Sequence, residues 1–195
     1  MIKTCFICCG SARKRAPSAD STFSSISCFS HWRRNNSLIS FKKVSALLKE
    51  TKDAGLEVVE LGSYAEGTDP ANGYFLLPHL VLNPPDEATI VSCEQMGPIL
   101  PIMKFSDVEE AVRRANDTEY GLSSSVWSRD IDKAFAIGSR IEAGCTWVNS
   151  HNLASVDVDG PFGGFKQSGV GQEFGGEHGI LQYTQYKTIT DNCMM

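Results

Sequence analysis

Strand-like and helix-like stretches alternate along most of this chain, and that alternation limits the fold more than any other feature. Helical spacing is predicted over residues 41–55, 106–117 and 129–144, and short apolar runs typical of strands occupy residues 56–61, 74–82, 99–105, 122–127 and 146–149. Strands that are separated by helices of this length form βαβ units, whose strands lie parallel. The sequence therefore predicts an α/β fold with a mostly parallel open sheet and flanking helices.

Apolar residues within the helical stretches predict which helix faces are buried. The expected buried positions are Val44, Leu47 and Leu48 in the first helix, Val108, Ala111, Val112 and Ala115 in the second, and Ile131, Ala134, Phe135 and Ile141 in the third. Gly55 and Gly144 stand where helices would end. Ser106 and Glu109 have the spacing of a capping box.

Residues 1–36 differ in composition from the rest of the chain. They contain six basic residues and one acidic residue. Because the whole chain has a net charge of −5, residues 37–195 carry a net charge of about −10. They are rich in serine and show no helical or strand period, which predicts a disordered or unrelated leader. The composition is also typical of an organelle transit segment. The expected location is therefore cytoplasmic, or mitochondrial if residues 1–36 are such a segment.

The composition of the whole chain excludes several function classes. No stretch approaches the roughly 20 continuous apolar residues of a membrane span, and the acidic net charge disfavours nucleic acid as a partner. The seven cysteines have no repeating spacing, which indicates reduced thiols rather than a disulfide framework. No metal site is predicted.

The stretch PFGGFKQSGVG at residues 161–171 contains four glycines, as phosphate-binding loops often do. Gly169 and Gly171 fit the start of a G-x-G-x-x-G fingerprint, but Phe174 stands in the third position. The Gly-Lys-Ser/Thr of a P-loop is also absent from this stretch. We therefore expect the glycines to allow sharp turns and close packing of the backbone.

Four stretches, in order along the chain, resemble segments of the aldehyde dehydrogenase superfamily. They are FKKVSALLKETKDAG, NGYFLLPHLVLNPPDEATIV, the long block from EQMGPILPIMKF to TWVNSHN, and PFGGFKQSGVGQEFGGEHGILQYTQYKTIT. The resemblance covers roughly residues 35–190. It implies a partial catalytic domain over residues 37–170, followed at 171–195 by a C-terminal helix and oligomerisation strand.

The resemblance implies oxidation of an aldehyde to a carboxylic acid with NAD or NADP. In this family a cysteine thiolate attacks the carbonyl, hydride passes to nicotinamide, and a glutamate activates water to hydrolyse the thioester. The cofactor domain, the ELGGK-like segment that holds this glutamate, and the amide of the oxyanion site have no counterpart here. We therefore expect a truncated chain that is inactive alone. The alternatives are a non-catalytic fragment or pseudoenzyme that associates with full-length relatives, and a split enzyme completed by another chain.

Three residues are candidates for cofactor binding by resemblance. Glu94 in CEQMGP matches a glutamate that hydrogen-bonds the nicotinamide ribose, and Met96 replaces a phenylalanine near that ribose. Lys43 matches a lysine near the adenosine end. The competing interpretations are a solvated surface glutamate and a lysine on a polar helix face.

The candidate nucleophile is Cys8, because Arg13 follows it at the family's spacing, although a chance cysteine in an unrelated leader is the alternative. Asn149 matches a residue that supports the active-site floor, or is a turn former at a strand end. Phe162 matches an aromatic of the aldehyde tunnel, or packs in a core. His151 is expected to be a loop or tunnel residue rather than a base, because the sequence shows no serine or cysteine partner for it.

The remaining expectations concern thiols and association. Cys93 and Cys145 stand where the family has no nucleophile, and we expect them to be small buried residues. Residues 185–190 alternate like a strand, and in the family the matching strand joins a neighbouring subunit's sheet. The expected partners are therefore a small-molecule aldehyde and, through residues 185–190, a second copy or a full-length relative.

Overall fold

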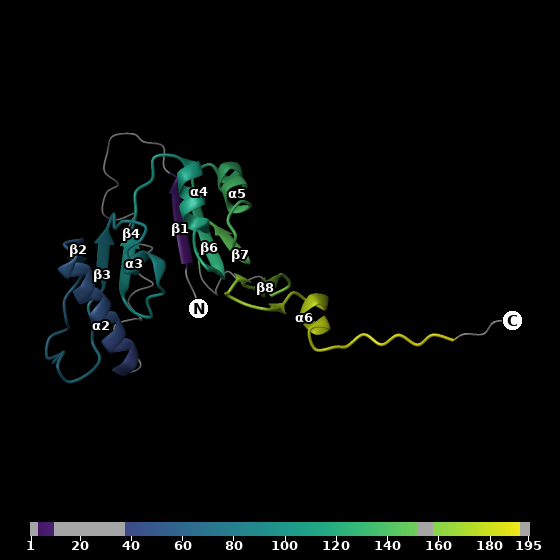
Figure 1. Ribbon diagram of the computed structural model, residues 1–195, viewed down its shortest axis with the longest axis horizontal. Coiled ribbons are helices and arrows are strands. Elements are labelled where there is room, and N and C mark those ends of the chain that lie inside the picture. Colours follow the sequence, from purple (N-terminus) through teal and green to yellow (C-terminus); the bar gives the residue numbers. More distant parts are fainter. Residues whose placement is uncertain (1–3, 10–37, 152–157, 192–195) are drawn as a thin grey trace. The chain divides into compact units, whose positions relative to one another are not determined.

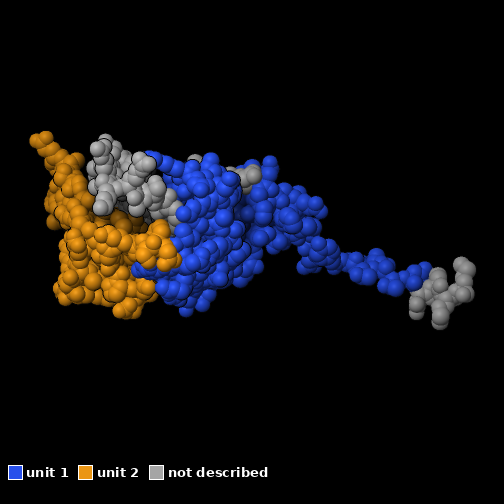
Figure 2. Space-filling model, turned by 90° about the horizontal axis from the view of Figure 1, so that it is seen from above, with its two compact units in different colours: residues 1–10, 108–195 blue, residues 11–107 orange. Residues whose placement is uncertain are grey.

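The computed structural model describes residues 4–9, 38–151 and 158–191. The chain divides into two compact units, residues 1–10 with 108–195 (unit 1) and residues 11–107 (unit 2), which Figure 2 colours blue and orange. The domain boundaries expected at residues 36 and 170 stay a prediction. The α/β class with open sheets is confirmed. Among the described helices, none is long and apolar enough to cross a membrane.

Unit 2 is a small sheet with two helices. Its elements are α2 (Leu38–Asp53), β2 (Glu57–Glu60), β3 (His79–Leu82), α3 (Thr89–Ser92) and β4 (Ile99–Ile102). The strand order is β2-β3-β4, with β3 parallel to β4 and antiparallel to β2. Figure 1 shows α2 and α3 beside these strands.

The core of unit 2 is aliphatic. Five buried side chains pack together: Val44, Leu48, Val81, Ile90 and Ile99. The predicted buried face of α2 is confirmed, because Val44 and Leu48 lie in this core and Leu47 packs against it. The helix ends as predicted before Gly55, which has the left-handed φ of 75° that glycine adopts without strain.

Unit 1 is built around three parallel strands. Its first elements are β1 (Thr4–Cys9), α4 (Val108–Asn116), β5 (Tyr120–Gly121), β6 (Ser123–Ser128), α5 (Ile131–Gly138) and β7 (Cys145–Val148). The order in the sheet is β1-β6-β7. Along the chain α5 connects β6 to β7, which is the βαβ unit that the alternation predicts.

The strand β1 departs from the prediction for the leader. Thr4–Cys9 lies within the segment expected to stay outside the fold, yet these six residues pair in register with β6. The stretch TCFICC is rich in apolar and β-prone residues, so its backbone can extend a sheet even though the surrounding composition is that of a leader. The rest of residues 1–36 lies outside the described residues.

Helix α5 presents a different face to the sheet than the sequence predicts. Ala134 is buried as expected, and so is Ile141 beyond the end of the helix, but Ile131 is 56% and Phe135 is 63% exposed. The reason is Gly138, where a Cβ atom would lie 3.1 Å from Cγ2 of Thr146 on β7. The helix therefore approaches the sheet on the side that carries this glycine, and Phe135 is turned outward.

The C-terminal part of unit 1 is a glycine-rich β-ribbon followed by a short helix. Its elements are β8 (Pro161–Gly163), β9 (Phe165–Lys166), β10 (Gln172–Phe174) and α6 (Glu177–Leu181). Antiparallel pairs join β10 to β8 and β9 to β5. The C-terminal helix expected within residues 171–195 is confined to α6, because Gly175 and Gly176 both have positive φ and precede it.

Residues 184–191 form no strand in the single chain, and the pairing of residues 185–190 with a neighbouring chain stays a prediction. Figure 1 shows the segment after α6 as an extended trace. A strand requires a hydrogen-bonded neighbour, and this segment has no ladder partner among the described residues of the single chain.

Candidate functional site

The turn between α3 and β4 carries the strongest cofactor candidate. Glu94 is half-buried in this turn and Met96 is 58% exposed. The neighbouring Gln95 folds its amide back over the turn, where Nε2 donates to the carbonyl oxygen of Ile90 and, at 2.8 Å, to that of Cys93. The backbone around Glu94 is therefore held by side-chain hydrogen bonds.

Gly97 and Pro98 fix the same turn to the core of unit 2. A Cβ atom at Gly97 would lie 2.6 Å from Cγ2 of the buried Val44, so only glycine allows this approach to α2. Pro98 is buried, and its carbonyl oxygen accepts from the backbone N–H of His79 at 2.8 Å. The turn is thus supported by α2 on one side and by β3 on the other.

Lys43 lies on α2 immediately before Val44 and is exposed. Because α2 packs against α3, the structure brings the helix that carries Lys43 next to the helix from which the Glu94 turn departs. All three candidate cofactor residues therefore belong to unit 2.

The two cysteines predicted to be buried behave differently. Cys93, in the same turn as Glu94, is exposed, so the expectation is wrong for it. The cause is that Cys93 follows the last residue of the short helix α3, where the chain leaves the core. Cys145 in β7 is half-buried, and burial raises the pKa of its thiol.

Asn149 ends β7 and ties it to β6. It adopts a left-handed φ of 51°, and its backbone N–H donates to the carbonyl oxygen of Val126 at 2.9 Å. Its side chain makes two more bonds to Ser128: Oδ1 accepts from the backbone N–H and Nδ2 donates to the carbonyl oxygen, both at 2.8 Å. The residue is therefore a strand-end clamp at the carboxyl edge of the sheet.

His151 has a serine partner, contrary to the expectation that it has none. Its Nδ1 lies 2.6 Å from Oγ of Ser125 on β6, and its ring meets Trp147 edge-on, with centroids 5.2 Å apart. Burial lowers the pKa of the imidazole. Ser125 stands 26 positions before His151, so the pair depends on the β6–β7 register, which no local sequence pattern reveals.

Phe162 lies in β8 and is half-buried, with its ring centroid 6.4 Å from that of Phe174 on β10. The glycines around it serve close packing, as expected. A Cβ atom on Gly144 would collide with the carbonyl oxygen of Gly163, and one on Gly163 would collide with that of Gly171. The ribbon is therefore packed backbone to backbone.

Cys8, the candidate nucleophile, lies in β1 and is in register with Trp127 of β6. The role of Cys8 as the nucleophile stays a prediction. Asn149, His151 and Phe162 belong to the same unit as Cys8, whereas Glu94, Met96 and Lys43 belong to unit 2.

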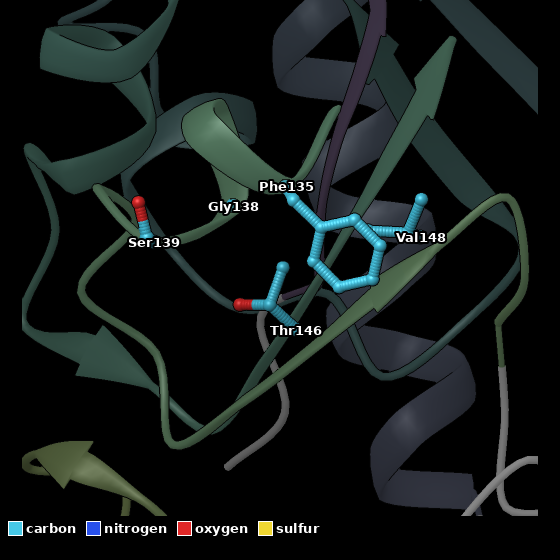
Figure 3. A pocket seen from close by; sticks show the side chains of 5 residues that line it. All are labelled: Phe135, Gly138, Ser139, Thr146 and Val148. Atoms are coloured by element: carbon cyan, nitrogen blue, oxygen red, sulfur yellow. The ribbon is translucent and has the colours of Figure 1, made fainter. Parts of the chain in front are cut away.

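An open pocket of about 210 Å³ lies between α5 and β7. Figure 3 shows the five residues that line it: Phe135, Gly138, Ser139, Thr146 and Val148. None of the candidate site residues is among them. Its lining is largely apolar and carries no titratable side chain, so it offers no acid, base or nucleophile. Within the described residues, no group of three or more His, Cys, Asp or Glu side chains could hold a metal ion.

The chain is similar to curated aldehyde dehydrogenases. Aldehyde dehydrogenase 1A1 of Homo sapiens is 41% identical over 150 residues, which is 77% of this chain and 28% of that protein. Aldehyde dehydrogenase, cytosolic 2 of Macroscelides proboscideus is 40% identical over 150 residues, or 77% of this chain and 60% of that sequence. The chain spans about 30% of the length of most of these relatives.

Solved structures of aldehyde dehydrogenases are also similar to this chain. An aldehyde dehydrogenase of Mycobacterium tuberculosis complexed with NAD+ matches with a TM-score of 0.68 and 33% identity over 76% of this chain and 30% of its own. A mutant of aldehyde dehydrogenase C from Pseudomonas syringae, complexed with NAD+ and octanal, matches with a TM-score of 0.68 and 30% identity over 77% of this chain and 30% of its own. Residues 36–189 match the model of the aldehyde dehydrogenase family. The chain belongs to the aldehyde dehydrogenase family.

Proposed function

We propose that this chain supplies part of the machinery for NAD(P)-dependent oxidation of an aldehyde to a carboxylic acid, with Glu94 positioning the nicotinamide ribose. When bound, the dinucleotide accepts the hydride that the aldehyde loses. The observation that carries the proposal is the turn at residues 93–98, in which Gly97 is pressed against Val44 and Pro98 is buried. A carboxylate on so constrained a turn holds its position when a ligand arrives.

The chemistry of this turn fits a dinucleotide. A half-buried carboxylate can accept hydrogen bonds from both hydroxyls of a ribose. The exposed thioether of Met96 offers an adaptable apolar contact beside it. Lys43 on the adjacent helix supplies a positive charge for the adenosine end. The cofactor is NAD or NADP.

The aldehyde side of the proposal rests on unit 1. Asn149 clamps the strand ends that form the floor of the active site, and His151 and Phe162 line the path of a small-molecule aldehyde. The three hydrogen bonds of Asn149 and the ring contact of Phe162 with Phe174 support these roles. Cys8 is the candidate nucleophile. The proposed location is cytoplasmic.

We expect no turnover by the 195 residues alone, because they contain no ELGGK-like segment. The test is the growth of reduced-nicotinamide absorbance with the purified chain, NAD or NADP, and a panel of aldehydes. Turnover on the order of 1 per second, ordinary for an enzyme, would contradict this expectation.

Cofactor binding is tested separately by titrating the chain with NAD and following ligand-observed NMR. Glu94→Gln should weaken binding about tenfold, the loss of roughly one charge-assisted hydrogen bond. Glu87→Gln is the matched control, because Glu87 is an exposed glutamate of the same unit that lies outside the turn. Equal binding by both variants would remove Glu94 from the proposal.

The second candidate function is association with another copy or with a full-length relative through residues 185–190. The segment is extended, and Tyr186 and Ile189 are exposed, so its backbone is available to pair with a second chain. Thr188→Pro removes one ladder donor, whereas Thr188→Val keeps it. Sedimentation should show association for the wild type and Thr188→Val and weaker association for Thr188→Pro. Clean monomers throughout at tens of micromolar would exclude this function.

A further inference from the structure

Two neighbouring serines of β6 point to opposite faces of the sheet, and both are buried. Oγ of Ser124 lies 2.7 Å from Oγ1 of Thr146, on the face that α5 covers. Oγ of Ser125 lies 2.6 Å from Nδ1 of His151 on the other face. Ser125 is fully buried, so its hydroxyl exchanges no hydrogen bond with solvent.

The turn at Asn149 brings His151 to this serine. Its left-handed φ reverses the chain directly after β7, and its three hydrogen bonds to β6 hold the reversal in place. The edge-to-face contact with Trp147, at an interplanar angle of 81°, restricts rotation of the imidazole. Position and ring plane of His151 are therefore both fixed.

The buried hydroxyl decides which nitrogen of His151 carries the proton. A buried O–H that finds no acceptor costs about 1–3 kcal/mol, and Nδ1 of His151 is the partner that the structure gives Ser125. Nδ1 accepts a hydrogen bond only when it carries no proton, which places the proton of the neutral ring on Nε2.

We propose that Ser125 is a positioning residue that donates to Nδ1 and thereby holds His151 as a neutral imidazole protonated at Nε2. This form adds no charge and offers a donor at Nε2. The inference rests on the proposed function in one respect, namely that His151 faces the aldehyde. Under that condition the site favours an aldehyde whose chain carries an oxygen acceptor, such as a hydroxyaldehyde, over a purely aliphatic one.

The surroundings of His151 agree with this assignment. Burial lowers its pKa, and the Ser125 hydroxyl and the Trp147 ring, which both contact the imidazole, carry no charge. Protonation of Nδ1 would also leave the Ser125 hydroxyl without its acceptor, which opposes the charged form further.

The test is ¹⁵N NMR of the imidazole in the full chain, recorded against pH. The expected wild-type result is one tautomer, with Nδ1 resonating as an unprotonated nitrogen and Nε2 as a protonated one. In Ser125→Ala we expect a mixture of tautomers and a His151 pKa that rises toward the ordinary value of about 6.5. The matched control is Ser124→Ala, which removes a buried hydroxyl from the opposite face and should leave the His151 signals unchanged. A wild-type signal from the Nδ1–H tautomer or from imidazolium at neutral pH would overturn the proposal, whatever the variants do.

A second arm separates this inference from the proposed function. Glycolaldehyde and propanal are added to the wild type, and glycolaldehyde is expected to shift the His151 resonances more. Equal shifts would overturn the preference for an oxygen-bearing aldehyde. No shift with either, together with the expected tautomer, would instead count against His151 as a tunnel residue.

Discussion

The two units of this chain are stabilised in different ways. Unit 2 has an aliphatic core of five buried side chains from two helices and two strands. In unit 1 the central strand β6 buries three serines, at positions 123–125, while large apolar side chains such as Phe135, Tyr183 and Ile189 stay exposed. Unit 1 also buries apolar side chains, among them Val126 and Ile137, but it adds the buried hydroxyls of β6 and close backbone contacts to them.

This difference suits the roles that we propose for the units. In unit 2 the aliphatic core supports the Glu94 turn through the contact of Gly97 with Val44. The buried hydroxyls of unit 1 orient other side chains, as Ser125 orients His151. The exposed apolar residues of unit 1 are the kind of surface that a second chain covers.

The largest expected effect is on the core of unit 2. Ile99→Ala removes a fully buried side chain between α2 and the sheet and should lower the free energy of unfolding by about 2–5 kcal/mol. Ile102→Ala in the same strand is the control, because Ile102 is partly exposed, and should cost about 1 kcal/mol or less. Urea titration followed by circular dichroism measures both. Equal losses would mean that unit 2 is not held by this core.

The second-largest effect on stability is expected for the close backbone contacts of unit 1. In Gly144→Ala the new methyl group would collide with the carbonyl oxygen of Gly163, so we expect a loss of about 1–3 kcal/mol. At Gly171 a Cβ atom would meet nothing closer than Oε1 of Gln182 at 3.5 Å, and Gly171→Ala should be nearly neutral. Tryptophan fluorescence in urea, measured in a Trp32→Phe background, follows this unit through Trp127 and Trp147. A neutral Gly144→Ala would show that the ribbon is not packed against this loop.

The Asn149 clamp should have a smaller effect. Asn149→Ala loses two side-chain hydrogen bonds and places a Cβ-bearing residue with little preference for positive φ at 51°, which together should cost about 1–2 kcal/mol. Asn149→Gly loses the same bonds but accepts the backbone conformation. Thermal unfolding should therefore rank the glycine variant between the alanine variant and the wild type. Wild-type stability in both variants would contradict the clamp.

The smallest expected effect is a pH dependence in unit 1. The pKa of His151 is lowered by burial in the folded state, so below about pH 6.5 the unfolded state binds a proton that the folded state does not. Its contribution to stability is therefore present above that pH and lost as the pH falls. His151→Gln should lose less stability than the wild type between about pH 7.5 and pH 5.5. Parallel pH profiles would show that His151 does not titrate in this way.

The sequence predicts best what depends on local pattern. The burial of Val44 and Leu48, the end of α2 at Gly55 and the βαβ order of unit 1 all follow from spacing or glycine conformation, and all are confirmed. The outward turn of Phe135 could not be predicted, because it results from how closely Gly138 lets α5 approach β7.

The candidate site divides in the same way. The structure supports the turn around Glu94 with contacts from Gly97 and Pro98, both of which the motif includes. The serine partner of His151 could not be predicted from the sequence. Ser125 and His151 meet because of the register between β6 and β7 and the turn at Asn149. Residues 4–9 were missed because a short apolar run within a basic, serine-rich segment carries no periodic signal.

The most direct test of the proposed function uses a chimera in which residues 36–189 replace the matching part of human aldehyde dehydrogenase 1A1. We expect the chimera to oxidise aldehydes with NAD, and its two variants to separate the units by their kinetics. Glu94→Gln in unit 2 should raise the KM for NAD or lower kcat while leaving the KM for the aldehyde unchanged. Phe162→Ala in unit 1 should raise the KM for the aldehyde alone. If both variants changed the same constant, or neither changed any, the division into a cofactor side and an aldehyde side would be wrong.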